Sequence, residues 1–205
     1  MDTKKDQSYV LHMLKEKQLQ RLRFPIGEIT KSQVREMASS LSLQTAGKAD
    51  SQDVCFISRT KGGRHRFLEE RMVMTPGEVI DLQGKQIANV PAIQMVTIGQ
   101  RKGLGVSGKG EPRYVIDVDI ESATVTAGSK GDLFCNETPI VNIQWVGGPI
   151  SGVIDIQTSA HGRTVKARVD EKIFWEHPHT KIAPGQSAVF YDDNKVVGSA
   201  IVSKS

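Results

Sequence analysis

The chain has 205 residues, of which 38% are hydrophobic and 24% are charged. This composition excludes a disordered chain and is typical of a globular protein with one large domain or two small ones. No run of about 18 apolar residues occurs, which excludes a membrane-spanning helix, and the polar start Met1–Asp6 lacks the apolar core of a signal peptide.

The two cysteines, Cys55 and Cys135, are 80 positions apart, and the sequence has no CxxC pair and no Cys/His cluster. This arrangement argues against a structural zinc site, so we expect no bound metal. It also indicates a reducing compartment. We therefore expect a cytoplasmic protein that does not associate with membranes.

The net charge of +4 is unevenly distributed. Residues 1–112 carry 18 Lys and Arg against 12 Asp and Glu, whereas residues 113–205 carry 9 against 11. An anionic partner would be attracted mainly to the first half. The bias is mild and does not by itself establish RNA binding.

The first third of the chain has helical patterns. Residues 8–22 predict an amphipathic helix, and residues 31–41 predict a second one that begins at a capping-box pattern, Thr30 and Gln33. A short apolar strand follows, so residues 1–60 are typical of the closing units of an α/β domain. Residues 64–72 predict a short basic helix, whose cations either contact phosphate or form a solvated face.

From residue 77 onward the hydrophobic period changes to two. Residues 78–82 and 86–90 flank a Gln-Gly-Lys turn and predict a hairpin, and short strands recur at regular spacing after residue 113. Such spacing is typical of a small antiparallel β-barrel. The predicted fold class is mixed α+β in three parts: an α/β remnant at 1–60, a small β-rich central domain at 61–112, and a barrel at 113–205.

Residues 97–112 form a glycine-rich loop. Gly103–Gly108 fits G-x-G-x-x-G, but a β pattern follows where a nucleotide loop needs a helix, so we reject a nucleotide site. Two interpretations remain open: a flexible hairpin loop, or a nucleic-acid loop in which Arg101 and Lys102 neutralise phosphate.

Cys55 lies where a polar, acidic turn enters an apolar strand, within Ala49–Ile57. A thiol at such a boundary is held rigidly and stays reachable, but it is reactive only as the thiolate. Lys48 favours the thiolate, whereas Asp50 and Asp53 raise a thiol pKa. On local chemistry alone, a packed structural cysteine is the simpler interpretation.

Four stretches resemble the bacterial tRNA-specific 2-thiouridylases (the MnmA family). Asp50–Ile57 is similar to the second cysteine motif of that family. Three more stretches resemble it in the same order: Lys5–Tyr9, Thr97–Gly105 and Pro184–Tyr191. Family members replace the oxygen at carbon 2 of a wobble uridine by sulfur. The resemblance implies that ATP adenylates this oxygen and that a cysteine persulfide then supplies the sulfur.

The resemblance also implies roles for particular residues. By motif position, Cys55 matches the persulfide-bearing cysteine. Further residues match tRNA contacts or lie near the tRNA: Lys5, Asp6, Gln7, Gln186, Arg101, Lys102, and Ser159 with Ala160, where the family's arginine- and tyrosine-rich stretch is not retained. The implied partners are tRNA and a sulfur-relay protein or cysteine desulfurase.

The sequence departs from the family at its front. It has no Ser-Gly-Gly-x-Asp-Ser nucleotide loop, and the family's first catalytic cysteine is absent, with Cys135 expected to pack. We expect the chain to be a C-terminal portion that cannot complete thiolation alone, because ATP with Mg would be bound mainly by the absent N-terminal domain. The alternatives are a non-catalytic RNA-binding module with a structural Cys55, and a protein-interaction β-barrel.

Overall fold

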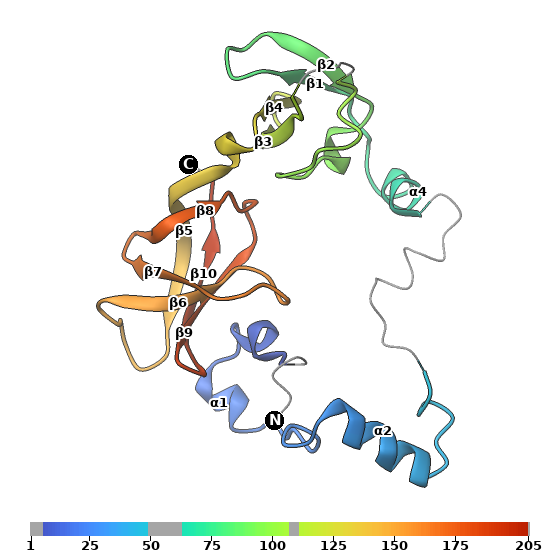
Figure 1. Ribbon diagram of the computed structural model, residues 1–205, viewed down its shortest axis with the longest axis vertical. Helices are drawn as coiled ribbons and strands as arrows, with labels where there is room; N and C mark the ends of the chain where they lie inside the picture. Colours follow the sequence, from blue (N-terminus) through green and yellow to red (C-terminus); the bar gives the residue numbers. More distant parts are fainter. Residues whose placement is uncertain (1–5, 49–62, 107–110, 205) are drawn as a thin grey trace.

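The computed structural model describes residues 6–48, 63–106 and 111–204 (Figure 1). It contains a helical N-terminal segment, a four-stranded sheet and a closed barrel. The helical elements of its first part are η1 (Ser8–Leu11), α1 (Glu16–Leu19), α2 (Lys31–Ser40) and α4 (Gly63–Glu69). Among the described residues, no helix is long and apolar enough to cross a membrane.

The two predicted N-terminal helices have different outcomes. The second is confirmed as α2, and the Thr30 side chain accepts a hydrogen bond from the Gln33 backbone in a complete capping box. The single helix predicted over 8–22 is wrong, because the segment forms the short η1 and α1 instead. Lys15 between them is extended at φ −78° and ψ 157°, and the Gln18 side chain caps its backbone N–H. This local cap starts a new helix rather than continuing the first.

The four-stranded sheet has the order β2-β1-β4-β3. Its strands are β1 (Gly77–Ile80), β2 (Gln86–Val90), β3 (Tyr114–Asp119) and β4 (Thr124–Gly128). β1 and β4 are parallel, whereas β1–β2 and β3–β4 are antiparallel. The predicted hairpin is confirmed as β1–β2, and its turn contains Gly84 at a φ of +80°.

One strand assignment from the sequence is wrong. The strand at 114–119 was grouped with the barrel, but β3 pairs with β4 in the four-stranded sheet. The reason is packing: Val115 on β3 is fully buried in one core with Val79 and Val125. Alternation along a strand predicts which side is apolar, but not which sheet buries it.

The barrel closes in the order β10-β5-β8-β7-β6-β9, and every pair is antiparallel. Its strands are β5 (Phe134–Trp145), β6 (Val153–Gln157), β7 (Val165–Val169), β8 (Lys172–Thr180), β9 (Ser187–Asp192) and β10 (Lys195–Val202). Phe190 lies at the centre of the core, with its ring centroid 5.1 Å from that of Trp145. Closure leaves no unpaired barrel edge. The predicted fold class, mixed α+β with a C-terminal antiparallel barrel, is confirmed.

The sheet and the barrel meet at a short seam. The Lys204 ammonium lies 3.0 Å from the Asp119 carboxylate across it, and a cavity of about 450 Å³ lies between the two units. Cys135 lines this cavity; its thiol donates a hydrogen bond to the His179 carbonyl at 3.4 Å and it packs against the barrel core. Cys135 therefore occupies the packing position expected for it.

We expect Phe190→Ala to lower the free energy of unfolding of the barrel by about 3–5 kcal/mol, because it leaves a cavity in a fully buried core. Phe174→Ala is the matched control. Phe174 is 37% exposed, so its loss should cost about 1 kcal/mol or less. Denaturant unfolding followed by far-ultraviolet circular dichroism measures both. Equal losses in the two variants would contradict this account of the core.

Candidate functional site

Strand β9 is covered on both of its faces. Ala188 and Phe190 point into the barrel core, so the alternation of a strand turns Ser187, Val189 and Tyr191 outward. Val189 is nevertheless 0% exposed and Tyr191 only 6% exposed. An outward-facing valine that is fully buried requires a covering segment.

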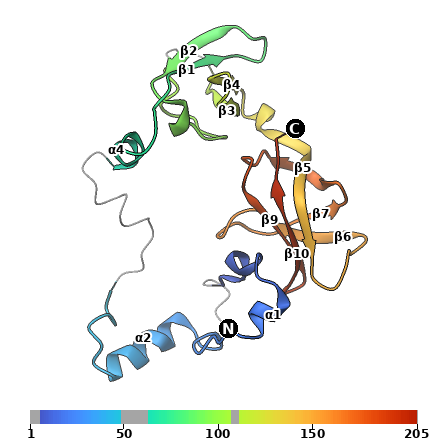
Figure 2. The same ribbon diagram turned by 180° about the vertical axis from the view of Figure 1, so that it is seen from behind.

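The N-terminal segment around η1 bonds to this outer face on both sides of Val189. The Tyr9 hydroxyl donates to the Ser187 carbonyl at 2.9 Å, and the Ser8 and Tyr191 hydroxyls lie 3.2 Å apart. Figures 1 and 2 both draw this segment against the barrel beside β9. The Asp6 carboxylate accepts from the Ser8 backbone N–H at 2.7 Å, which fixes the residues preceding η1.

Both tyrosines at this contact remain neutral at physiological pH. Burial raises the pKa of Tyr9, repulsion between the Tyr9 and Tyr191 phenolates, were both to ionise, raises it further, and the hydrogen bond to Ser187 opposes the rise. Burial also raises the pKa of Tyr191, which the Asp6 carboxylate raises further. The Tyr9 hydroxyl therefore stays protonated and donates to the Ser187 carbonyl, and the contact depends on hydrogen bonds between neutral groups.

Two exposed turns flank the start of β9. Gln186 ends a turn that contains Gly185 at a φ of +86°, and its backbone bonds hold the turn against β10. The second turn, at 159–162, follows β6. Gln157, the last residue of β6, pairs with Val189, so the turn begins at the same end of the sheet as the start of β9. The Gln157 side-chain amide donates to the carbonyls of Ser159 and Gly162 and closes this turn.

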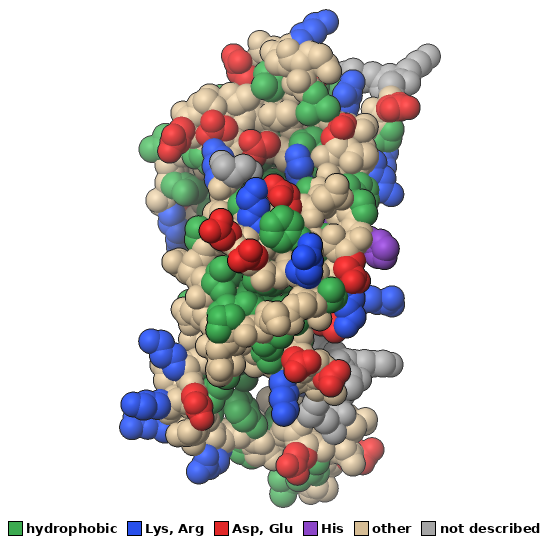
Figure 3. Space-filling model, turned by 90° about the vertical axis from the view of Figure 1, so that its left-hand side faces the viewer, with side chains coloured by type: hydrophobic (Ala, Val, Ile, Leu, Met, Phe, Trp, Pro, Cys, Tyr) green, Lys and Arg blue, Asp and Glu red, His purple; other side chains and the backbone are tan. Residues whose placement is uncertain are grey.

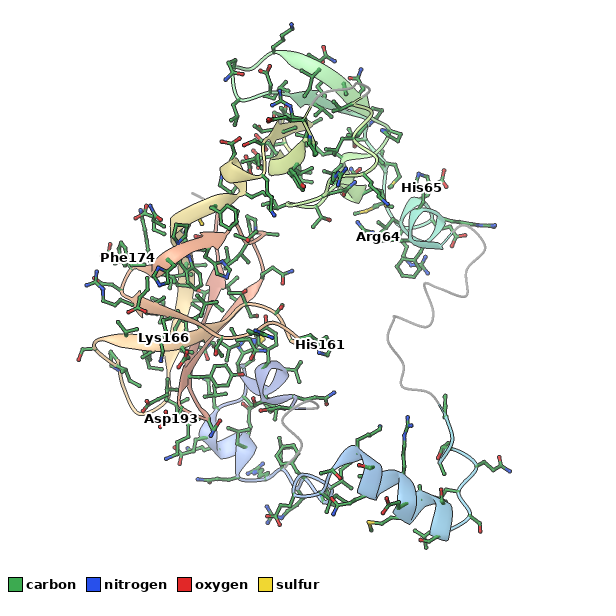
Figure 4. All side chains as sticks on the ribbon, in the orientation of Figure 1. Arg64, His65, His161, Lys166, Phe174 and Asp193 are labelled. Carbon is green, nitrogen blue, oxygen red and sulfur yellow. The ribbon has the colours of Figure 1, made fainter. Side chains whose placement is uncertain are left out.

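The side chains of the barrel point to two distinct sides. In Figure 4, His161 of the 159–162 turn lies on one side of the barrel, whereas Lys166 and Phe174 lie on the other side and Asp193 lies at its lower end. Figure 3 faces that other side; acidic and basic side chains are interspersed over most of it, and several basic side chains gather at its lower left.

The glycine-rich loop presents cations from a fixed backbone. Residues 99 and 100 bond to the Val115 backbone of β3, and buried Leu104 packs in the core of the sheet. The Gln100 side chain accepts from the Thr97 N–H and donates to the Lys102 carbonyl, so it stabilises the loop from within. Arg101 and Lys102 are left exposed.

Three family models match consecutive parts of the chain. A tRNA methyl transferase HUP domain matches residues 1–59, a tRNA methyl transferase PRC-barrel domain matches 65–129, and an aminomethyltransferase beta-barrel domain matches 138–202. The second match ends after β4, in agreement with the pairing of β3 and β4 in the four-stranded sheet.

Curated relatives match over the whole length. The tRNA-specific 2-thiouridylase MnmA of Chloroflexus aggregans is 37% identical over 213 residues, covering 100% of this chain and 59% of the relative. The MnmA protein of Herpetosiphon aurantiacus is 37% identical, covering 99% and 58%, and that of Zymomonas mobilis is 35% identical, covering 100% and 56%. The chain belongs to the tRNA-specific 2-thiouridylase family. It spans less than two thirds of the length of these relatives.

The residues expected to contact tRNA in this family divide into three groups. Asp6 and Gln7 precede η1, whose Ser8 and Tyr9 bond to Tyr191 and Ser187 of β9; Ser159 and Ala160 lie in the turn after β6, the neighbour of β9, and Gln186 directly precedes β9. Arg101 and Lys102 lie in the four-stranded unit, at the opposite end of the molecule from the N-terminal segment (Figure 1). Lys5 and Cys55 lie outside the described residues, so their roles in a 2-thiouridylase stay predictions.

Sequence reasoning missed the residues that assemble the β9 surface: Ser8, Tyr9, Tyr191 and Gln157. A signal was present, since Ala188–Tyr191 is continuously apolar or aromatic where a half-exposed strand would alternate. Such a run indicates a strand that is covered on both faces. It does not say which segment covers it.

The Tyr9 hydroxyl should hold the N-terminal segment on the barrel. In Tyr9→Phe, the Ser187 carbonyl loses its donor, and we expect the segment to open more readily by about 0.5–1.5 kcal/mol. Hydrogen exchange at residues 8–11 would then be faster by up to about tenfold. Tyr114→Phe, on β3, is the matched control. Unchanged exchange in Tyr9→Phe would show that this hydroxyl does not anchor the segment.

Gly105 should be indispensable for the loop. Its φ is +67°, and a Cβ there would lie 2.7 Å from the Asn89 carbonyl oxygen. Gly84→Ala isolates the conformational cost, because Gly84 has a φ of +80° and nothing within 4 Å. We expect Gly84→Ala to cost roughly 1–2 kcal/mol and Gly105→Ala to cost clearly more, as measured by thermal unfolding. An equal loss would mean that the close approach to Asn89 does not constrain the loop.

Proposed function

We propose that this chain carries the sulfur-delivering cysteine and the tRNA-docking surfaces of a cytoplasmic tRNA 2-thiouridylase. The observation that supports this most directly is the assembly around β9. Two stretches that match tRNA contacts of the family, Asp6–Gln7 and Gln186, directly precede η1 and β9, and the turn at Ser159–Ala160, where the family's arginine- and tyrosine-rich stretch is not retained, follows the neighbouring strand β6. The relatives are named tRNA-specific 2-thiouridylases, which points to the same thiolation activity. The substrate would be tRNA, and the site of modification would be C2 of a wobble uridine.

In this proposal, Cys55 carries a persulfide received from a cysteine desulfurase or a sulfur-relay protein. The terminal sulfur forms a bond to C2 of a uridine whose O2 has been activated, and the activated oxygen departs with the bond electrons. A second thiol then attacks the Cys55 sulfur. It cleaves the S–S bond and leaves 2-thiouridine and a disulfide that joins the thiol to Cys55.

ATP would supply the activation of O2, but the residues of this chain do not fit an ATP site. Glu111 and Pro112 at the end of the glycine-rich loop lead into β3, and in the described part of the loop, residues 97–106 and 111–112, no helix N-terminus is present to receive a triphosphate. No Ser-Gly-Gly-x-Asp-Ser motif occurs in the 205 residues. We therefore derive no step through ATP on this chain, and we propose that its binding requires other sequence.

The sulfur-delivery role predicts selective labelling of one cysteine. We expect the chain, incubated with a cysteine desulfurase and cysteine, to gain about 32 Da per added sulfur, located on Cys55 by peptide mapping. Cys55→Ser should abolish the adduct and Cys135→Ser should retain it, because the Cys135 thiol is half-buried and bonded to the His179 carbonyl. Intact-mass spectrometry is the measurement.

The outcomes separate the proposal from its main alternative. An adduct on Cys55 alone supports sulfur delivery. Equal labelling of both cysteines would indicate nonspecific thiol exposure. No labelling of a folded chain that still binds tRNA would favour the alternative, a non-catalytic RNA-binding module in which Cys55 is structural.

A further inference from the structure

A groove runs along the edge of the four-stranded sheet, between β2 and the glycine-rich loop. Its volume is about 810 Å³. Three separate segments line it: residues 85–87, 101–106 and 111–113. Among the described strands, β2 pairs only with β1, so its other side borders this groove rather than a further strand.

The groove is strongly basic, and each of its three segments contributes positive charge. Its cationic side chains, all exposed, are Lys85, Arg101, Lys102 and Arg113. One acidic side chain, Glu111, lies with them. None of the four cations takes part in the ion pairs formed within the described ranges.

One of the four cations acts on a neighbouring carboxylate. Hydrogen bonds from Ser129 lower the pKa of Asp132, and the charges of Lys181 and Arg113 lower it further. Arg113 acts on Asp132 through its charge alone, and Asp132 does not line the groove. The four cations and one carboxylate that line the groove therefore leave it with an excess of positive charge. Like charges around one groove repel each other, and a bound anion removes that repulsion. Stability of the fold therefore does not explain the arrangement.

The backbone of the groove suits close approach by an anion. Gly103 and Gly105 have positive φ angles of +76° and +67° and carry no side chain. The loop is also fixed in place, since Leu104 is buried and Gln100 bonds to Lys102. A rigid loop presents its cations without an ordering cost on binding.

We propose that this groove binds the phosphodiester backbone of RNA at a site separate from the β9 surface. The cations are spread along an open groove, which matches successive phosphates better than one compact phosphate group. No helix begins in the described residues after the loop, 111–119, which argues against a mononucleotide site. This inference rests on the proposed function, in which tRNA is the partner, and it adds Lys85 and Arg113 to the contacts.

The salt dependence of tRNA binding tests the proposal. The probe is an unmodified tRNA transcript, and its affinity for the full chain is measured by fluorescence anisotropy across salt concentrations. Each neutralised phosphate contributes roughly 0.7–0.9 to the slope of log K against log salt. We expect Lys85→Ala and Arg113→Ala each to reduce the slope by about that amount, and the variant with all four cations replaced to reduce it by roughly 3.

Matched controls come from the barrel. Arg168→Ala on β7 is the control for the arginines, and Lys195→Ala on β10 is the control for the lysines; both side chains are exposed. Neither should change the slope. Because all replaced side chains are exposed, circular dichroism should show the same folded state in every variant.

The outcomes distinguish this inference from the proposed function. If the unaltered chain binds the transcript and the groove variants behave like the controls, the groove proposal is overturned and the proposed function stands. If the unaltered chain does not bind the transcript at all, both fail. If the groove variants bind the transcript with an unchanged slope but lose the binding of polyglutamate that the unaltered chain shows, the groove takes an acidic peptide and the RNA proposal is overturned.

Discussion

The burial of Val189 on the outer face of β9 is the constraint on which the arrangement of the barrel surface depends. A strand with one face in a barrel core normally presents its other face to water. Here that face is apolar at its centre, and Tyr9 and Ser8 of the N-terminal segment bond to Ser187 and Tyr191 on either side of Val189. The same contact holds Asp6 and Gln7, which directly precede η1, at the barrel. A packing requirement thereby assembles a polar surface from parts that are more than 150 residues apart.

Features with their own local signals could be predicted from the sequence. The capping box of Thr30 and Gln33 fixes the start of α2 through bonds within four residues, and the Gln-Gly-Lys turn fixes the β1–β2 hairpin. The capping box and the hairpin turn each depend only on residues that are close together in the sequence, so both can be recognised from the sequence alone. The barrel was predictable for a related reason, since regular short strands with alternating burial have few ways to cover their apolar sides.

The rest depends on partners that the local sequence does not name. Whether β3 joins the barrel or the sheet is decided by the core that receives Val115. The break between η1 and α1 depends on the Gln18 cap at Lys15, which competes with a continuous helix. Arg101 and Lys102 were recognisable as cations on a glycine loop. Lys85 and Arg113 were not, because only the folded sheet brings the hairpin turn and the start of β3 beside that loop.

The β9 surface and the basic groove differ in how they are held together, and this difference separates their responses to salt. Neutral hydroxyls hold the β9 contact, with tyrosine pKa values raised by burial, so ionic strength should leave its geometry unchanged. The groove acts through exposed charges, which salt screens over about 8–10 Å at physiological strength. Added salt therefore weakens the attraction of a polyanion to the groove while the surface around β9 keeps its shape. A polyanion that needs both would lose its electrostatic contact first.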